Sequence, residues 1–282
     1  MSDPSEAPTP EGAAPDTIVL IHGLWMTPRS WENWQARYES RGFRVLAPAW
    51  PGMEVEVEAL NADPSPIKAL NVDRVVDHYS EIIGGLERPP IIMGHSFGGT
   101  FMQILLDRGF GAVGIGVASG TVKGVRDLPL STIKATAPAL NPLKKGEPVP
   151  LSAKEFHYAF TNTLTREESD KVYERYHVPA ATTVLREGAF ANFHKDAPTK
   201  VDFARPGRAP LLFIAFSEDH IIPPKASRHN EEKYDASVSI TEFIEFAGRP
   251  HFPGAPGWEE VADHALQWAV DKASGSPGPA TA

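Results

Sequence analysis

The stretch "PPIIMGHSFGGTF" at residues 89–101 decides the fold class, because its polarity changes abruptly within a few positions. The apolar run Ile91 to Met93 is typical of a buried β-strand, and "GGTFMQILLDRG" at 98–109 is typical of a helix. Between them stands Gly94-His95-Ser96-Phe97-Gly98, a G-x-S-x-G pattern. In this strand-to-helix context the pattern predicts a tight turn with Ser96 at its apex.

A turn of this kind would present the Ser96 hydroxyl above the sheet, at the N-terminus of the following helix. Free amides and the helix dipole favour developing negative charge there. The small residues Gly94 and Gly98 leave room for the chain to turn. An ordinary strand-to-helix turn also uses Gly and Ser, so the role of Ser96 depends on what the rest of the chain supplies.

Outward from this turn, strands and helices alternate along the chain. Apolar or β-branched runs predict strands at 17–23, 43–52, 112–119, 210–216 and 239–248, and helical spacing of apolar residues predicts helices at 30–42, 72–86 and 258–273. Alternation of this kind predicts an α/β fold with a mostly parallel, doubly wound sheet and helices on both faces.

The domain organisation that we expect is one core with one insertion. The core comprises residues 16–120 and 211–273, and the insertion at 121–210 is a series of proline-punctuated helical segments without a convincing central strand. Residues 1–15 and 274–282 are rich in Pro, Ser, Gly and Ala, so we expect both tails to be disordered.

Composition excludes several kinds of chemistry and argues against some partners. The 282-residue chain has no cysteine, which excludes disulfides, zinc–thiolate sites and cysteine nucleophiles. Its net charge of −9 disfavours nucleic acids and anionic membranes as partners. No run approaches the roughly 18 apolar residues of a membrane span, and residues 1–15 lack the apolar segment of a secretory signal. We therefore expect a cytoplasmic protein that acts on a small molecule.

A glycine pattern and the absence of ligand motifs bear on cofactors. Gly109, Gly111 and Gly114 match G-x-G-x-x-G, but they follow a helix and enter a strand, which is the reverse of the dinucleotide-binding arrangement. We interpret them as a helix stop and a turn. No H-E-x-x-H or comparable spacing is present, so neither a cofactor nor a metal is expected.

A serine hydroxyl becomes a good nucleophile only when a base accepts its proton and a third group orients that base. In the strand-end order Ser, Asp or Glu, His, the later strands offer Asp219 after 210–216 and His251 after 239–248. We predict Ser96 as the nucleophile, His251 as the general base and acid, and Asp219 as its orienting carboxylate.

Glu218 beside Asp219 is the alternative acid. Among other histidines, His95 lies inside the turn, where a structural role is expected. The reaction also needs an oxyanion hole. We predict that one donor is the Phe97 amide, directly after the nucleophile, and that the other is the Leu24 amide in "HGLW" at 22–25, with Trp25 as the alternative.

Together, "HG", G-H-S-x-G-G, the aspartate before "HIIPP" and the histidine in "GRPHF" closely resemble the α/β-hydrolase superfamily over about residues 16–273. The resemblance implies an eight-stranded sheet, of which this chain is expected to start at the strand bearing "HG", without the first two. It also implies that 121–210 is a helical cap over the active site. "PAWPGM" at 48–53 departs from the aspartate and Gly-rich turn of many capped members, which leaves the subfamily open.

Within the superfamily, serine at 96 argues against epoxide hydrolases and haloalkane dehalogenases, which use aspartate. We predict a serine hydrolase that cleaves carboxylic esters, or lactones, through an acyl-enzyme on Ser96. A C–C bond hydrolase or a cofactor-free lyase on the same fold is the alternative, and a ligand-binding receptor with little turnover is a further one.

The substrate that we expect is small to medium in size and largely apolar, because the residues that flank the predicted catalytic positions are apolar. These residues are Trp25, Met26, Ile221 and Phe252. Aromatic side chains of the insertion could line a pocket or simply pack together: Phe156, His157, Tyr158, Phe160, Tyr173, Tyr176 and His177.

Overall fold

The computed structural model describes residues 14–127 and 129–273, and a parallel sheet of six strands forms its centre. The strands are β1 (Thr17–Ile21), β2 (Arg44–Leu46), β3 (Ile91–His95), β4 (Val113–Val117), β5 (Leu211–Phe216) and β6 (Thr241–Phe246). They lie in the order β2-β1-β3-β4-β5-β6, and every neighbouring pair is parallel. The predicted α/β fold with a doubly wound sheet is therefore confirmed.

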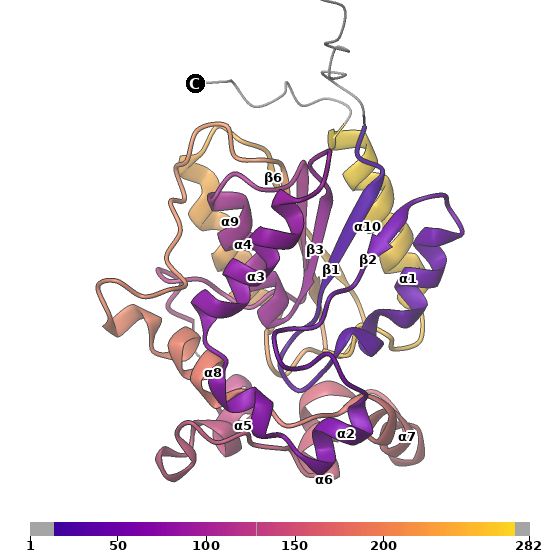
Figure 1. The fold of residues 1–282 in the computed structure, drawn as a ribbon, viewed down its shortest axis with the longest axis vertical. Coiled ribbons are helices and arrows are strands. Elements are labelled where there is room, and N and C mark those ends of the chain that lie inside the picture. The colour runs from indigo at the N-terminus through magenta and orange to yellow at the C-terminus, as the bar shows by residue number, and fades with distance from the viewer. Residues whose placement is uncertain (1–13, 128, 274–282) are drawn as a thin grey trace, which may run out of the picture.

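Helices cover both faces of this sheet (Figure 1). The helices of the core are α1 (Glu32–Glu39), α3 (Val72–Gly84), α4 (Phe97–Asp107), α9 (Pro224–Glu232) and α10 (Trp258–Ala273). In β1, Ile18 and Leu20 pack in one cluster with α1 and α10, while Val19 and Ile21 pack in another with α3 and α4. Successive residues of a strand point to opposite faces, so an uninterrupted apolar run suits a strand that is covered on both sides.

The second strand is much shorter than the sequence predicted. The prediction extended it over 43–52, but β2 ends at Leu46. Pro48 and Pro51 lack the N–H that a sheet ladder needs, so the chain leaves the sheet before them. The segment that follows instead places Trp50 in the core, 1% exposed.

Between β4 and β5 the chain forms helices and no named strand among the residues described. These helices are α5 (Leu130–Leu140), α6 (Ala153–Phe160), α7 (Arg166–Tyr176) and α8 (Thr182–Ala189), with short 3₁₀ turns at Pro142–Lys144 and Ala191–Phe193. Capping boxes start two of them, at Ser152 for α6 and at Thr165 for α7. We call this segment the helical insertion. Figure 1 shows it gathered beyond the carboxyl ends of the strands, together with α2 (Val57–Ala62).

Two further predictions can be compared with the structure. Gly109 and Gly111 have φ of 87° and 82° and turn the chain from α4 into β4, which confirms the interpretation of these two glycines as a helix stop and turn. For Gly114 the interpretation was wrong, because it lies within β4. The tails predicted to be disordered fall outside the described residues, apart from residues 14 and 15. Among the described residues, no helix combines the length and the apolar character that crossing a bilayer requires.

Candidate active site

The loops that carry the predicted site residues all leave the same edge of the sheet. The strand order reverses at β1, which has β2 on one side and β3 on the other. In open parallel sheets, ligands bind outside the carboxyl ends of the strands at such a switch point. The "HGLW" loop follows β1 and Ser96 follows β3, so both lie at this point, and Asp219 and His251 follow β5 and β6.

Ser96 occupies a strained turn. Its φ is 53° and its ψ is −123°, in a region that residues other than glycine rarely adopt. The surrounding backbone holds it there: the Ser96 N–H donates to the Val117 carbonyl at 3.1 Å, and the Ser96 carbonyl accepts from the amides of Gly99 at 2.9 Å and Gly120 at 2.7 Å. The sharp strand-to-helix turn predicted from G-x-S-x-G is therefore present.

Close backbone approach explains the small residues around this turn. A Cβ atom on Gly94 would lie 2.2 Å from the Gly98 carbonyl oxygen, and one on Gly98 would lie 2.2 Å from the Ile21 carbonyl oxygen. A Cβ on Gly23 would lie 2.7 Å from Cβ of Ser96. Glycine at these positions thus lets the turn close and brings the "HGLW" loop against Ser96.

Asp219 and His251 are in direct contact. His251 Nδ1 lies 2.6 Å from Asp219 Oδ2, and both side chains are fully buried. The other carboxylate oxygen accepts from the amides of Ile221 at 2.7 Å and Ile222 at 2.8 Å. Glu218 is exposed and accepts from the Ser217 hydroxyl, so Asp219 rather than Glu218 is the carboxylate that contacts His251.

The bond to Asp219 leaves one nitrogen of His251 available. A neutral imidazole that donates through Nδ1 has an acceptor at Nε2, and Nε2 of His251 has no hydrogen-bond partner among the described residues. Nor does any hydrogen bond join it to Ser96 Oγ in the part of the chain described. Such catalytic hydrogen bonds are often long in the absence of substrate and tighten in its presence.

Buried aromatic groups fix the "HGLW" loop. His22 Nδ1 lies 3.0 Å from the Gly23 carbonyl oxygen, and its Nε2 accepts from the Trp50 amide at 3.4 Å. The rings of His22 and Trp50 stack with centroids 4.7 Å apart. Burial lowers the pKa of His22 to about 4, so this side chain is neutral at pH 7 and donates through Nδ1.

That contact orients one of the predicted oxyanion donors. In a trans peptide the C=O and the N–H point in opposite directions, so holding the Gly23 carbonyl also fixes the Leu24 N–H. Within the described residues, the Leu24 and Phe97 amides donate no hydrogen bond. The Trp25 amide donates none either, and Trp25 has a positive φ of 63°. Trp50 is a contributor to this loop that the sequence analysis missed, because no motif marks a residue that stacks on His22.

The helical insertion is bonded to the loops of the site. The Val178 amide donates to the Trp25 carbonyl at 3.0 Å, and the Trp25 indole donates to the Val149 carbonyl at 3.1 Å. The Phe252 amide donates to the Phe160 carbonyl at 2.9 Å. Ser96 is consequently only 7% exposed.

The four residues predicted to contact substrate are all buried at this junction. Trp25, Met26, Ile221 and Phe252 belong to one apolar cluster with residues of the insertion. The aromatic residues of the insertion mostly pack on one another, as in the Phe156–Phe160 stack at 4.8 Å. Phe160 also reaches the site, because its ring lies edge-on to His251 with centroids 5.0 Å apart.

A network of charged residues joins the insertion to the core. Arg175 in α7 makes a bidentate contact with Glu32 in α1, at 2.6 and 2.9 Å, and the Tyr176 hydroxyl also donates to Glu32. Arg29 pairs with Glu56 and Glu58 and donates to the Arg175 carbonyl at 3.2 Å. These residues form what we call the latch.

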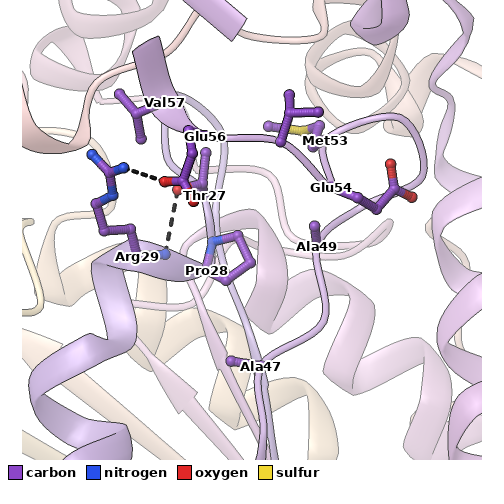
Figure 2. Close-up of a pocket in the computed structure, with 10 residues that line it drawn as sticks. Thr27, Pro28, Arg29, Ala47, Ala49, Met53, Glu54, Glu56 and Val57 are labelled. Carbon is purple, nitrogen blue, oxygen red and sulfur yellow. Dashed lines mark hydrogen bonds and ion pairs between the residues drawn. The ribbon is translucent and has the colours of Figure 1, made fainter. Parts of the chain in front are cut away.

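A surface pocket of about 430 Å³ lies beside the latch (Figure 2). It is lined by residues 27–29, 47, 49 and 53–57, and Figure 2 shows Arg29 and Glu56 paired at its rim. Neither Ser96 nor His251 lines it, so this pocket is separate from the buried site. The described residues contain no group of three or more His, Cys, Asp or Glu side chains that could hold a metal ion.

Comparison with known proteins places the chain in a wider context. A model of the family described as "Alpha/beta hydrolase family" matches residues 18–264. No match was found among curated proteins.

Several solved structures share the fold. A monoacylglycerol lipase of Paleococcus ferrophilus is 21% identical, with a TM-score of 0.62 over 92% of this chain and 96% of that chain. An extracellular alpha/beta-hydrolase of a Paenibacillus species is 19% identical, with a TM-score of 0.68 over 91% of this chain and 99% of the other. A pyrethroid hydrolase of Sphingobium faniae is 18% identical, with a TM-score of 0.64 over 90% of this chain and 96% of the other.

Proposed function

The chain belongs to the alpha/beta hydrolase family and is thus an enzyme of the hydrolase type, and we propose that it cleaves carboxylic esters, lactones included, through an acyl-enzyme on Ser96. One observation carries this proposal. Asp219 holds Nδ1 of a buried His251 while Nε2 has no hydrogen-bond partner among the described residues, at the same sheet edge as the strained Ser96 turn. A base with one occupied and one available nitrogen is what a serine nucleophile requires.

In the acylation step, Ser96 Oγ attacks the ester carbonyl carbon while His251 Nε2 accepts the hydroxyl proton. Asp219 stabilises the imidazolium that forms. The carbonyl oxygen becomes an oxyanion, which accepts hydrogen bonds from the Leu24 amide in the loop after β1 and from the Phe97 amide at the N-terminus of α4. His251 then gives the proton to the departing alcohol as the C–O bond breaks.

Deacylation repeats the sequence with water as the nucleophile. His251 accepts a proton from water as the water oxygen attacks the acyl carbon. It returns that proton to Ser96 Oγ as the carboxylic acid leaves. The buried, apolar surroundings of Trp25, Met26, Ile221 and Phe252 support a largely apolar substrate of small to medium size. The names of two structural neighbours, a lipase and a pyrethroid hydrolase, are in keeping with this reaction class.

We also propose that the helical insertion at 121–210 acts as a cap, since it bonds to the loops of the site. The proposed setting is the cytoplasm, with a small-molecule substrate and no nucleic acid or membrane partner, in keeping with the net charge of −9.

The proposal is tested by labelling with a fluorophosphonate probe and by hydrolysis of short p-nitrophenyl esters. The wild-type protein should react with both, and Ser96→Ala should lose all labelling and at least about 10⁴-fold in ester turnover. Labelling that survives in Ser96→Ala would rule out Ser96 as the nucleophile. Turnover of a ketone panel with no turnover of esters would favour the C–C hydrolase or lyase instead.

A further inference from the structure

His95, the residue before Ser96, is fully buried and bonds to the main chain of His251. Its Nε2 lies 2.8 Å from the His251 carbonyl oxygen, and the two rings lie with centroids 4.7 Å apart. A carbonyl oxygen can only accept, so Nε2 of His95 carries the hydrogen. His95 therefore donates to the residue whose side chain we propose as the base.

The donor is a neutral imidazole. Burial, with smaller contributions from His251 and His22, holds the pKa of His95 well below its usual range. Its Nδ1 has no hydrogen-bond partner among the described residues. Because Nε2 is committed to the carbonyl, the side chain has one fixed orientation and adds no charge next to His251.

His251 needs such support because it lies in the loop between β6 and α10, outside regular structure. On the side of the insertion, the Phe252 amide is held by the Phe160 carbonyl. On the side of the core, within the described residues, His95 alone bonds to the backbone of His251 itself. The loop is thus held from two sides. On the core side the Trp34 indole donates to the Pro253 carbonyl at 2.9 Å and the Glu218 amide to the Arg249 carbonyl at 3.0 Å, and His95 supplies the contact at His251 itself.

We propose that His95 is a positioning residue that sets the distance between the nucleophile and the base, an inference that rests on the proposed function of Ser96 and His251. His95 ends β3 and Ser96 follows it directly, so the two share one rigid backbone segment. The bond from His95 therefore ties the backbone of His251 to the segment that carries Ser96. A displacement of about 1 Å at reacting groups can cost about 100-fold in rate.

The decisive comparison uses two substitutions of similar length. His95→Gln keeps an N–H donor at nearly the reach of Nε2, whereas His95→Met fills similar space with no donor. We expect His95→Met to lower kcat for p-nitrophenyl esters about 10- to 100-fold, with KM changed less than about threefold. His95→Gln should recover most of kcat. Thermal unfolding of both variants establishes that they are folded.

Tyr38→Phe is the matched control. Tyr38 in α1 is fully buried, and its hydroxyl donates to the Ala262 carbonyl in α10 at 3.0 Å, a side-chain-to-carbonyl bond that involves none of the proposed site residues. Loss of this bond should leave kcat unchanged. Equal losses of kcat in Tyr38→Phe and His95→Met would contradict a positioning role for His95, because they would reflect general destabilisation.

A second readout does not depend on ester turnover. The proton between His251 Nδ1 and Asp219 should give a strongly deshielded ¹H NMR signal, which His251→Gln removes and so assigns. We expect this signal to be sharp in wild type and His95→Gln and broadened in His95→Met. A sharp signal and full kcat in His95→Met would overturn the proposal. If the wild type proves inactive on esters, the proposed function fails, and the NMR signal alone still decides whether His95 positions His251.

Discussion

At the scale of single residues, the chemistry of the site depends on which side-chain atoms have a hydrogen-bond partner and which are available to a substrate. Asp219 has both oxygens occupied, by His251 and by the amides of Ile221 and Ile222. A carboxylate held in this way fixes the tautomer of the imidazole that it contacts. Because that contact places the hydrogen on Nδ1, Nε2 of His251 is an acceptor, and it has no hydrogen-bond partner among the described residues.

Substitution of the carboxylate tests this dependence. Asp219→Asn keeps the shape of the side chain but favours the wrong imidazole tautomer, so kcat should fall by about 10⁴-fold with the protein still folded. Glu218→Gln, one position away and exposed, is the matched control and should leave kcat within about twofold. A large loss in Glu218→Gln with little loss in Asp219→Asn would reverse the assignment. Both effects are measured from initial rates on p-nitrophenyl esters.

Sequence reasoning at this scale reached some residues and missed others for physical reasons. Ser96, Asp219 and His251 could be picked out because parallel strands bring their carboxyl ends to one edge. The contact of His95 could not, since it joins a side chain to a backbone carbonyl 156 positions later, and the course of that loop leaves no signal in residue types. His95 was expected to have a structural role, and its partner was not foreseen.

At the scale of elements, the helical insertion, which we propose as a cap, is bonded to the core by the latch. Glu32 stands in the first turn of α1 and Arg175 in the last turn of α7, so their contact spans core and insertion. The hydrogen bond with Arg175 lowers the pKa of Glu32 below its usual range. Glu32 is therefore ionised at pH 7 and attracts α7 to the core.

Loosening the latch should admit a bulky reagent more rapidly. Glu32→Gln removes the charge that Arg175 and Tyr176 contact, and we expect fluorophosphonate labelling of Ser96 to accelerate several-fold, more so for larger probes. Lys171→Gln is the matched control, because Lys171 pairs with Glu167 within α7 and does not reach the core. Identical labelling rates for wild type and Glu32→Gln would show that the latch does not restrict access.

The bounds of an element were predicted correctly where one residue pattern repeats over many positions. They were predicted poorly where one or two residues end the element. Helix α10 has the bounds that the sequence predicted, because its amphipathic spacing continues from Trp258 to Ala273. The predicted strand at 43–52 was too long because an apolar run continued past the prolines that end it. The contacts between insertion and core depend on tertiary packing, which residue spacing does not specify.

At the scale of the whole molecule, buried neutral histidines link stability to pH. Burial lowers the pKa of His22 and of His177 to about 4 from 6.5. Each accepts a backbone hydrogen bond through Nε2, His22 from Trp50 and His177 from Leu151. The unfolded chain therefore binds more protons than the folded chain between pH 6.5 and pH 4. Their contribution to stability is fully present above pH 6.5 and is lost as the pH falls toward 4.

His177→Gln isolates one of these contributions. Between pH 7 and pH 5, the free energy of unfolding of the wild type should fall by about 2 kcal/mol through His177 alone, on top of all other groups. His177→Gln should lack this contribution, so its free energy of unfolding should fall by about 2 kcal/mol less than that of the wild type. Urea unfolding at the two pH values measures the difference, and an equal fall in both proteins would contradict the assigned shift.

The proposed mechanism depends on a covalent intermediate at the apex of the β3–α4 turn. The most direct test is to label the native protein with a fluorophosphonate, digest it, and locate the adduct in its peptides by mass spectrometry. We predict a single adduct per chain, located on Ser96, and absent from Ser96→Ala. An adduct on another residue, or an unmodified protein that still hydrolyses esters, would contradict the acyl-enzyme mechanism.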